Sequence, residues 1–416
     1  MYYPLLVVVP SFISLAIAGQ IQQFKNKPSI SSAWFTGWHA ADIKPAFAVA
    51  DVSWDKYTHL IYSFAETTSN VQTLDLSGSE PTILPVFVKT AHQNGVKAMI
   101  SVGGWTGSRF FSTDIATAAN RTAFVKTIID FVQKYNLDGV NIDWEYPNNQ
   151  GIGCNTINKQ DSSHLLSFLK ALRKDPVGAT LVVSAAVVGP FIGSNGDPMS
   201  DVSAFAEVLD HVQVMNYDVN GPWSAAVGPN APLNDTCAPD NFQSGSAVDF
   251  VSAWSQAGFP TSKIVLGVAS YGHSFVVAEK DAFTDSKKTQ LALYAPFNAS
   301  VAPAGDAWDD AAGVDECGNF QSQGGVINFW GLIAQGYLNP DGTPKASVPY
   351  MYDTCTQTPF VYNTTTKVMI SYDDARSFAA KGAWIKSAGL AGFAIWEAGG
   401  DPNDILLDSI RTAAGF

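Results

Sequence analysis

The sequence predicts an α/β fold: a (β/α)8 TIM barrel with a small α+β insertion domain between strands 7 and 8. Eight short apolar, β-branched stretches recur along the 416-residue chain, with amphipathic segments between them. Several stretches are almost continuously apolar, as expected for parallel strands covered on both faces. A doubly wound open sheet is the alternative, but eight evenly distributed strand–helix units favour a closed barrel.

The predicted elements alternate along the chain. The β-branched and aromatic runs predict strands at Ala33–Trp38, Tyr57–Phe64, Lys97–Val102, Gly139–Glu145, Thr180–Val187, His211–Asp218, Lys263–Tyr271 and Gly389–Trp396. Segments with helical periodicity predict helices that include Ile115–Tyr135, Asp161–Arg173, Val202–Leu209, Ala247–Ala257 and Asp373–Ser387. Each helix would cover the outside of the barrel between two strands.

The regular spacing breaks once, between the seventh and eighth strands, where the gap is far too long for one helix. This gap has strand-like pieces of its own, at Gly325–Trp330, Val348–Tyr352, Phe360–Tyr362 and Lys367–Ile370. A long segment with its own elements predicts a folded insertion rather than a structureless loop. We therefore expect an insertion domain over residues 275–370 and a barrel over residues 19–274 and 371–416.

The composition indicates a folded, exported protein. Hydrophobic residues make up 46% of the chain, and a net charge of −13 argues against nucleic acid or an anionic membrane surface as a partner. An apolar run followed by a small-x-small pattern at Ala16-Ile17-Ala18 predicts a signal peptide over residues 1–18, hence a secreted, extracellular protein. A membrane anchor is the alternative, but the run is short for a span of about 20 residues. Four glycosylation sequons accompany it, at Asn120, Asn234, Asn298 and Asn363.

Four cysteines suit an oxidising compartment, and none has the spacing of a metal site. Three pairings are open. Location favours Cys154–Cys237, which follow strands four and six on one face of the barrel, together with Cys317–Cys355 inside the insertion. We expect no metal, no cofactor and a monomeric chain.

The stretch Asp138-Gly-Val-Asn-Ile-Asp-Trp-Glu-Tyr-Pro147 carries the candidate chemistry. Strand alternation places one set of side chains toward the barrel lumen and the other toward the helices. The lumen set is Gly139, Asn141, Asp143 and Glu145, and the outward set is Val140, Ile142 and Trp144. The carboxyl end of a strand is where such barrels place catalysis, and two neighbouring carboxylates raise at least one pKa. A purely structural polar network is the alternative.

This stretch resembles the DGxDxDxE signature of the family 18 glycoside hydrolases, the chitinase family. Further matches follow in the family's order, at Ser101–Gly104 (SxGG), Gln213–Asp218 (QxMxYD), Leu266–Gly272, Ser371–Asp374 and Gly389–Glu397. The resemblance spans roughly Ala33 to Phe416, looks closest to secreted fungal enzymes, and implies a chitinase insertion domain. Its implied substrate is chitin or chitooligosaccharide.

The spacing of the two carboxylates constrains the mechanism. Asp143 and Glu145 lie on one strand, with Cα atoms about 6.6–6.8 Å apart at normal strand rise. They cannot flank a glycosidic bond from opposite sides, as an ordinary two-carboxylate glycosidase requires. One acid with a neighbour favours substrate assistance, in which the substrate's N-acetyl oxygen attacks C1. Glu145 then protonates the leaving oxygen, and Asp143 orients the acetamido group.

The resemblance assigns further roles around these two groups. Tyr217 is implied as the third catalytic residue, bonded to the N-acetyl group, with Met215 and Asp218 lining the same pocket. Trp396 is implied as the floor beneath the sugar in subsite −1. Trp105 and Trp38 would be platforms for flanking sugars, since flat indoles match the apolar faces of pyranose rings; for Trp38, ordinary core packing is the alternative.

Two positions depart from the family pattern. Asn141, which is also predicted to be among the substrate-binding residues, stands where the signature has Asp. This replacement weakens the coupling of charges around Asp143 and predicts an altered pH profile. His273 replaces an Arg common after the Tyr-Gly of strand seven, which puts that substrate contact in doubt. Two other functions stay open: a chitin-binding, lectin-like protein, and an endo-β-N-acetylglucosaminidase that cuts N-glycans. The retained Glu145 argues against a lectin-like protein, because such relatives typically lose this acid. The insertion argues against the endo-β-N-acetylglucosaminidase, because it would deepen one wall of the cleft and favour linear chitin.

Overall fold

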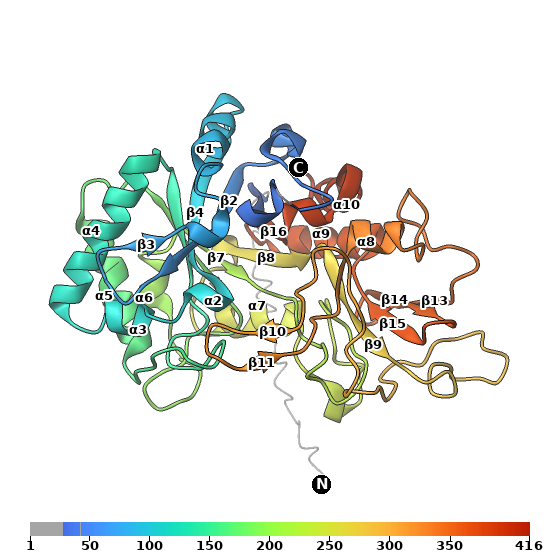
Figure 1. Ribbon diagram of the computed structural model, residues 1–416. Helices are drawn as coiled ribbons and strands as arrows, with labels where there is room; N and C mark the ends of the chain where they lie inside the picture. Colours follow the sequence, from blue (N-terminus) through green and yellow to red (C-terminus); the bar gives the residue numbers. More distant parts are fainter. Residues whose placement is uncertain (1–27, 42) are drawn as a thin grey trace, which may run out of the picture.

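Eight parallel strands close into a barrel in the computed structural model, which describes residues 28–41 and 43–416. The strands are β1 Ile30–Thr36, β2 His59–Thr67, β4 Lys97–Gly103, β5 Gly139–Asp143, β6 Val182–Val187, β7 His211–Val214, β8 Ile264–Ala269 and β16 Gly392–Trp396. The ring closes because β1 pairs in parallel with β16 on one side and with β2 on the other. The predicted (β/α)8 barrel is therefore confirmed (Figure 1). The predicted signal peptide, residues 1–18, lies outside the described residues.

Helices follow most of the barrel strands and cover the outside of the ring. The larger ones are α1 Leu84–Gln93, α4 Ala118–Tyr135, α5 Asp161–Lys174, α7 Ala247–Gln256, α9 Ala375–Ala388 and α10 Ile405–Ala414; the short ones are α2 Gly104–Gly107, α3 Phe111–Asp114 and α6 Ser203–Ala206. Thr117 caps α4 by accepting the backbone N–H of Asn120 at 3.1 Å, so this helix begins later than predicted. Within residues 28–41 and 43–416, no helix is long and apolar enough to cross a membrane.

The catalytic candidate strand is shorter than predicted. β5 ends at Asp143, because its neighbour β4 ends opposite it at Gly103 and turns there into α2. The turn uses Gly104 at φ +80°, where a side chain would meet the ring of Phe64. The predicted alternation nevertheless continues beyond the strand: Trp144 stays buried and stacks on Phe111 at 5.1 Å.

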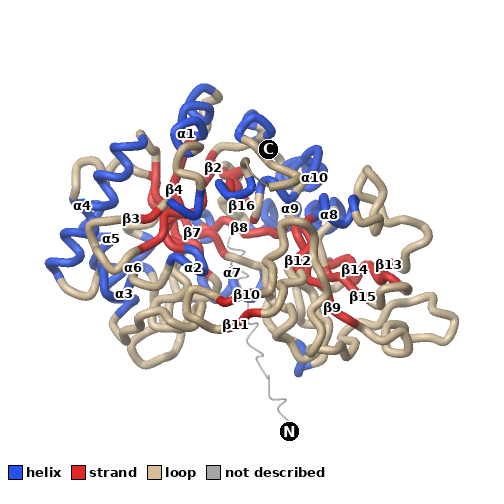
Figure 2. The backbone as a smooth tube through the Cα atoms, in the orientation of Figure 1, coloured by secondary structure: helices blue, strands red, loops and turns tan. Residues whose placement is uncertain are grey.

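A second, antiparallel sheet begins directly after β8, the seventh strand of the barrel. Its strands are β9 Tyr271–Val276, β12 Val326–Asn328, β13 Tyr350–Asp353, β14 Thr358–Asn363 and β15 Val368–Ser371, in the order β12-β9-β15-β14-β13, with α8 Phe329–Ala334 beside it. The seventh predicted strand is thus two strands, broken at Ser270. Phe275, Phe360 and Met369 lie in a hydrophobic cluster of this sheet. Figure 2 shows its strands grouped apart from the barrel. The domain bounds 275–370 stay a prediction.

The predicted disulfides are wrong. The structure pairs Cys154 with Cys317 and Cys237 with Cys355, with Cα atoms 5.5 Å and 6.3 Å apart. The prediction kept each bridge within one unit, whereas both observed bridges join a barrel loop to the long segment between β8 and β16. The reason is that this segment folds back over the barrel: Leu233, for example, donates its N–H to the carbonyl of Thr356 at 2.8 Å.

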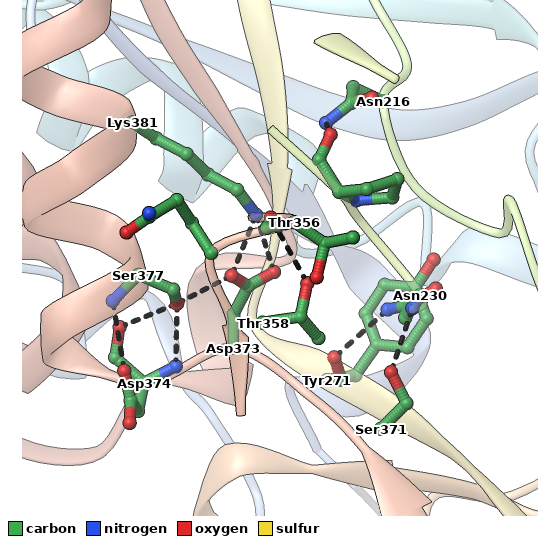
Figure 3. Close-up of polar contacts among 12 residues, drawn as sticks. Asn216, Asn230, Tyr271, Thr356, Thr358, Ser371, Asp373, Asp374, Ser377 and Lys381 are labelled. Atoms are coloured by element: carbon green, nitrogen blue, oxygen red, sulfur yellow. Dashed lines mark hydrogen bonds and ion pairs between the residues drawn. The ribbon is translucent and has the colours of Figure 1, made fainter. Parts of the chain in front are cut away.

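A buried ion pair also joins the second sheet to the barrel (Figure 3). Asp373 follows β15, and its two carboxylate oxygens accept from Lys381 of α9 at 2.6 and 2.7 Å. The hydroxyl of Ser377 donates to the same carboxylate at 2.6 Å. Because a buried charge that loses its partner is strongly destabilising, this pair fixes how α9 meets the sheet.

Candidate active site

A cavity of about 630 Å³ opens at the carboxyl ends of the barrel strands. It brings together most of the predicted site residues: Asp143, Glu145, Met215, Tyr217, Asp218, Trp105 and Trp396. Its other lining residues are Phe64, Tyr146, Val188, Val219, Ser244, Phe250 and Asp310. Asn141 and Trp38 are not part of the lining. The predicted residues that converge here lie at or just after the carboxyl ends of β4, β5, β7 and β16, as in barrels whose site is built from several strand ends.

The backbone of Glu145 is held by two side chains although β5 has already ended. The hydroxyl of Ser108, just after α2, accepts the N–H of Glu145 at 3.0 Å, and the amide of Asn155 donates to its carbonyl at 2.6 Å. The Ser108 hydroxyl also lies 2.7 Å from the carbonyl of Gly104 and 3.0 Å from that of Asp143. These bonds replace the missing strand ladder and fix the carboxyl of Glu145 at the cavity.

Burial makes both carboxyls weak acids. The low-polarity surroundings raise the pKa of Asp143 to about 7, and its Oδ1 has no hydrogen-bond partner among the described residues. The pKa of Glu145 lies well above its usual range, first because of burial and then because Asp143 is close; a side-chain hydrogen bond with Tyr146 offsets part of this rise. The expected pKa elevation is therefore present. The raised pKa favours the protonated form of Glu145, which a general acid requires.

Asn141 lies beneath Asp143 in the lumen and uses its amide on other partners. Its oxygen accepts from Ser101 at 2.9 Å, and its nitrogen lies 2.9 Å from both the Ser184 hydroxyl and the Gln213 oxygen. No hydrogen bond joins Asn141 to Asp143 within the described part of the chain. Asn141 is fully buried and does not line the cavity, so its predicted role in substrate binding stays a prediction.

On the opposite wall, a buried asparagine that the sequence did not single out holds Asp218. Asp218 has a left-handed backbone, φ +57°, and its N–H is bound by the side-chain oxygen of Asn230 at 2.9 Å. The amide of Asn230 donates to the carbonyl of Tyr271 at 3.1 Å, and its backbone N–H to Ser371 at 2.8 Å (Figure 3). Asn230 thus connects the end of β7 to β9 and β15.

The carboxylate of Asp218 is held from the second sheet. The Tyr271 hydroxyl donates to its Oδ1 at 2.6 Å, and Nε2 of His273 lies 2.7 Å from the same atom. Because a carboxylate only accepts, the hydrogen sits on Nε2 of His273. His273, where the family commonly has Arg, therefore positions Asp218. Burial also raises the pKa of the neighbouring Tyr217 far above its usual value, so its hydroxyl stays a donor.

Aromatic rings form the floor of the cavity. Phe64 stacks on Trp396 with ring centres 5.6 Å apart, and Trp34 contacts Trp396 edge-on at 5.9 Å. Trp38 lies 6.5 Å from Trp396 and stacks on Phe64 at 5.9 Å. Trp38 therefore supports this floor from the side. Trp38 does not line the described cavity, and its role as a platform for a sugar stays a prediction.

Several lining residues were missed by sequence reasoning. Tyr146 follows Glu145 in the signature itself, and its position in the motif was a usable signal. Phe64 ends a predicted strand and was also within reach. Asp310 lies in the long segment between β8 and β16, where no periodicity or motif marks it.

Comparison with known proteins identifies what the chain resembles. The family described as Glycosyl hydrolases family 18 matches residues 31–401. A chitinase-like effector of Moniliophthora roreri is 52% identical over 414 residues, 99% of this chain and 100% of the relative. Chitinase A1 of Niallia circulans is 33% identical over 329 residues, 76% of this chain and 42% of the relative. A solved chitinase structure from Rhizomucor miehei superposes with a TM-score of 0.81 at 31% identity, over 92% of this chain and 100% of that one.

Proposed function

The chain belongs to family 18 of the glycosyl hydrolases, and we propose that it hydrolyses β-1,4-N-acetylglucosamine linkages in chitin or chitooligosaccharides. The observation that carries the proposal is the geometry of the cavity, where the carboxyl of Glu145 lies together with buried Asp143 and with Tyr217. Burial and the nearby Asp143 raise the pKa of Glu145, which favours its protonated form. Relatives named chitinases support the substrate class. The predicted export of the chain as a monomer is part of the same proposal.

In the first step, Glu145 gives its proton to the glycosidic oxygen as the bond from C1 breaks. The N-acetyl oxygen of the sugar in subsite −1 attacks C1 and forms a cyclic oxazolinium ion. Asp143 accepts a hydrogen bond from the acetamido N–H as positive charge develops there, and Tyr217 donates to the acetamido oxygen. The orphaned Oδ1 of Asp143 suits this role, because it has no partner to lose.

In the second step, the Glu145 carboxylate takes a proton from water as the water attacks C1. The oxazolinium ring opens, which restores the acetamido group, and the configuration at C1 is retained. Trp396 supports the sugar ring from below, while Met215 and Asp218 line the wall of the pocket. Trp105, half exposed at the mouth, offers a platform to a neighbouring sugar.

One experiment tests this directly. The wild type and Glu145→Gln are incubated with chitotetraose, and the first-formed anomer is read by NMR. We expect β-anomer from the wild type and a loss of about a thousandfold in the variant, as for removal of a general acid. Asp114→Asn is the matched control, since Asp114 is a buried carboxyl with its pKa raised to about 7, outside the cavity. First-formed α-anomer would contradict substrate assistance.

A second candidate is chitin binding without turnover. It is favoured by Asn141, which replaces an acidic residue of the signature and is bonded entirely to other neutral groups. The chitinase-like effector of Moniliophthora roreri is consistent with such a divergence. Binding of chitotetraose without cleavage by the wild type would favour this candidate. Cleavage of a high-mannose glycopeptide instead of chitotetraose would favour an endo-β-N-acetylglucosaminidase.

A further inference from the structure

A stiff hairpin, residues 310–324, borders the cavity and is called the arm below. It contains the short strands β10 Gly313–Val314 and β11 Phe320–Gln321. We infer that the arm is a second substrate-binding surface, on which Val314 and Phe320 contact the face of insoluble chitin outside the cavity. The choice of chitin as occupant rests on the proposed function.

The root of the arm is fixed to both units of the molecule. Asp309 accepts backbone N–H groups of Gly305, Gly325 and Val326 at 2.9–3.0 Å, which closes the base of the hairpin. The adjacent Trp308 stacks on His39 at 3.9 Å. Its indole N–H also donates to the carbonyl of Pro45 at 2.7 Å, in the loops that follow β1.

The turn of the arm is organised by one carboxylate. Asp315 accepts the N–H groups of Cys317 and Asn319 at 2.9 and 2.8 Å, and the side-chain amide of Gln321 at 2.6 Å. The strands pair in antiparallel register, with Val314 opposite Phe320. A carboxylate that collects several donors in this way holds a short hairpin in one conformation.

The tip of the arm is tied to the other side of the cavity. Cys317 is bonded to Cys154 in the loop that follows Glu145, and Glu316 lies 3.7 Å from Arg109, just after α2. Figure 1 shows β10 and β11 between α2 and the second sheet. Since Asp310 and Trp105 both line the cavity, the arm continues the rim of the substrate site.

The arm presents an apolar pair to solvent. Val314 is 71% exposed and Phe320 is 73% exposed, more than any other large hydrophobic side chain of the described residues. Directly opposed residues of an antiparallel pair share one face, so these two side chains form one patch. Single exposed apolar residues are ordinary, but a pair held outward on a hairpin fixed at its root, turn and tip is not.

The position of the patch selects the occupant. Neither Val314 nor Phe320 lines the cavity, so the patch that they form lies outside the space beside Glu145. The patch continues a rim that includes the indole of Trp105, and the apolar faces of pyranose rings match such side chains. A second copy of the chain is a poor fit, because a stable interface buries about 800 Å² on each partner and two side chains supply far less.

The test uses Val314→Ser with Phe320→Ser, and Val86→Ser as the matched control. Val86 is 53% exposed on α1, away from the cavity. Partition onto insoluble chitin is measured in the Glu145→Gln background, so that turnover does not enter. We expect the double variant to bind about fivefold more weakly, because it loses the apolar contacts of both side chains with chitin. The affinity of the control for insoluble chitin should be unchanged. The single variant Phe320→Tyr, in which Val314 is kept, should retain most of the affinity.

Binding of chitotetraose, measured in the same proteins, should be equal in all of them, because neither Val314 nor Phe320 lines the cavity that holds Glu145. Equal partition of the double variant and the control onto insoluble chitin would overturn the inference. So would sedimentation showing a wild-type dimer that the double variant abolishes. If the wild type cleaves no oligomer but its partition onto insoluble chitin still depends on Phe320, the proposed hydrolysis is wrong and the inference about the arm is supported.

Discussion

Burial shifts the pKa values of ionisable groups in opposite directions at the two ends of the barrel lumen. At the carboxyl ends of the strands, burial raises the pKa of Asp143 to about 7. At the amino ends, burial lowers the pKa of His59 to about 4 and that of His211 to about 3. In both places the low-polarity interior favours the uncharged form. The carboxyls of Asp143 and Glu145 line the cavity, whereas His211 is buried away from it.

A neutral network separates the two ends. Asn141 contacts Ser101, Ser184 and Gln213, and the Gln213 amide nitrogen lies 3.0 Å from Nε2 of His211. Because that nitrogen donates, His211 accepts at Nε2 and is neutral. The same burial therefore favours protonated carboxyls beside the cavity and a neutral, hydrogen-bonded imidazole at the enclosed end.

Among variants that keep Glu145, the largest expected effect comes from removing the charge of Asp143. In Asp143→Asn, kcat on chitotetraose should fall by about a hundredfold or more, because the charge that balances the developing oxazolinium is lost. The same variant should also change how the stability of the fold depends on pH. The raised pKa of Asp143 stabilises the fold fully below the usual Asp value of 3.8, and this contribution is lost as pH rises through about 7. The melting temperature of the variant should therefore fall less between pH 5 and pH 8 than that of the wild type.

The enclosed end should give the opposite pH dependence. The pKa of His211 is lowered from 6.5 to about 3, so its contribution to stability is fully present above 6.5 and is lost as pH falls toward 3. A proton difference of this kind changes the free energy of unfolding by about 1.4 kcal/mol per pH unit. His211→Gln should flatten the decline of the melting temperature between pH 6.5 and pH 4. Activity at neutral pH should be nearly unchanged; a loss as large as that of Asp143→Asn would mean that the two ends are not independent.

A smaller effect is expected at the cavity wall. Asn230→Ala removes the bonds to Asp218 N–H and the Tyr271 carbonyl, and we expect kcat to fall about tenfold through misplacement of Asp218 and Tyr217. KM should change less than kcat. Asn230→Asp keeps the acceptor for Asp218 and should recover part of the rate. Equal melting losses in the two variants with equal kcat would show that Asn230 acts only on the fold.

Local patterns account for what the sequence predicted well. The alternation through residues 139–145 sorts Asn141 from Trp144 correctly, because it depends only on the extended backbone. The convergence of Glu145, Tyr217 and Trp396 follows from the closure of a ring of parallel strands. Each of these results needs only a short stretch of chain and the rule that strand ends meet on one face.

Contacts between distant segments account for what it missed. β5 stops at Asp143 because β4 turns away at Gly103. Cys317 pairs with Cys154 because the arm reaches the loop after Glu145. Asn230 and Asp310 lie in segments without periodicity and acquire their places from the parts of the fold around them. No local pattern carries such information, so these positions could only be found in the structure.

The smallest effect tests the network between the two ends of the lumen. Asn141→Asp would place a carboxyl below Asp143 and remove the amide donors that now serve Ser184 and Gln213. Two neighbouring buried carboxyls share a proton and raise each other's pKa, so the alkaline limb of the pH–rate curve should move upward, by about one pH unit or less. Ser184→Ala disturbs the same network without adding charge and should leave the limbs in place. If Asn141→Asp moves neither limb, the neutral amide at position 141 does not set the pH profile, and the cavity carboxyls titrate independently of the lumen below them.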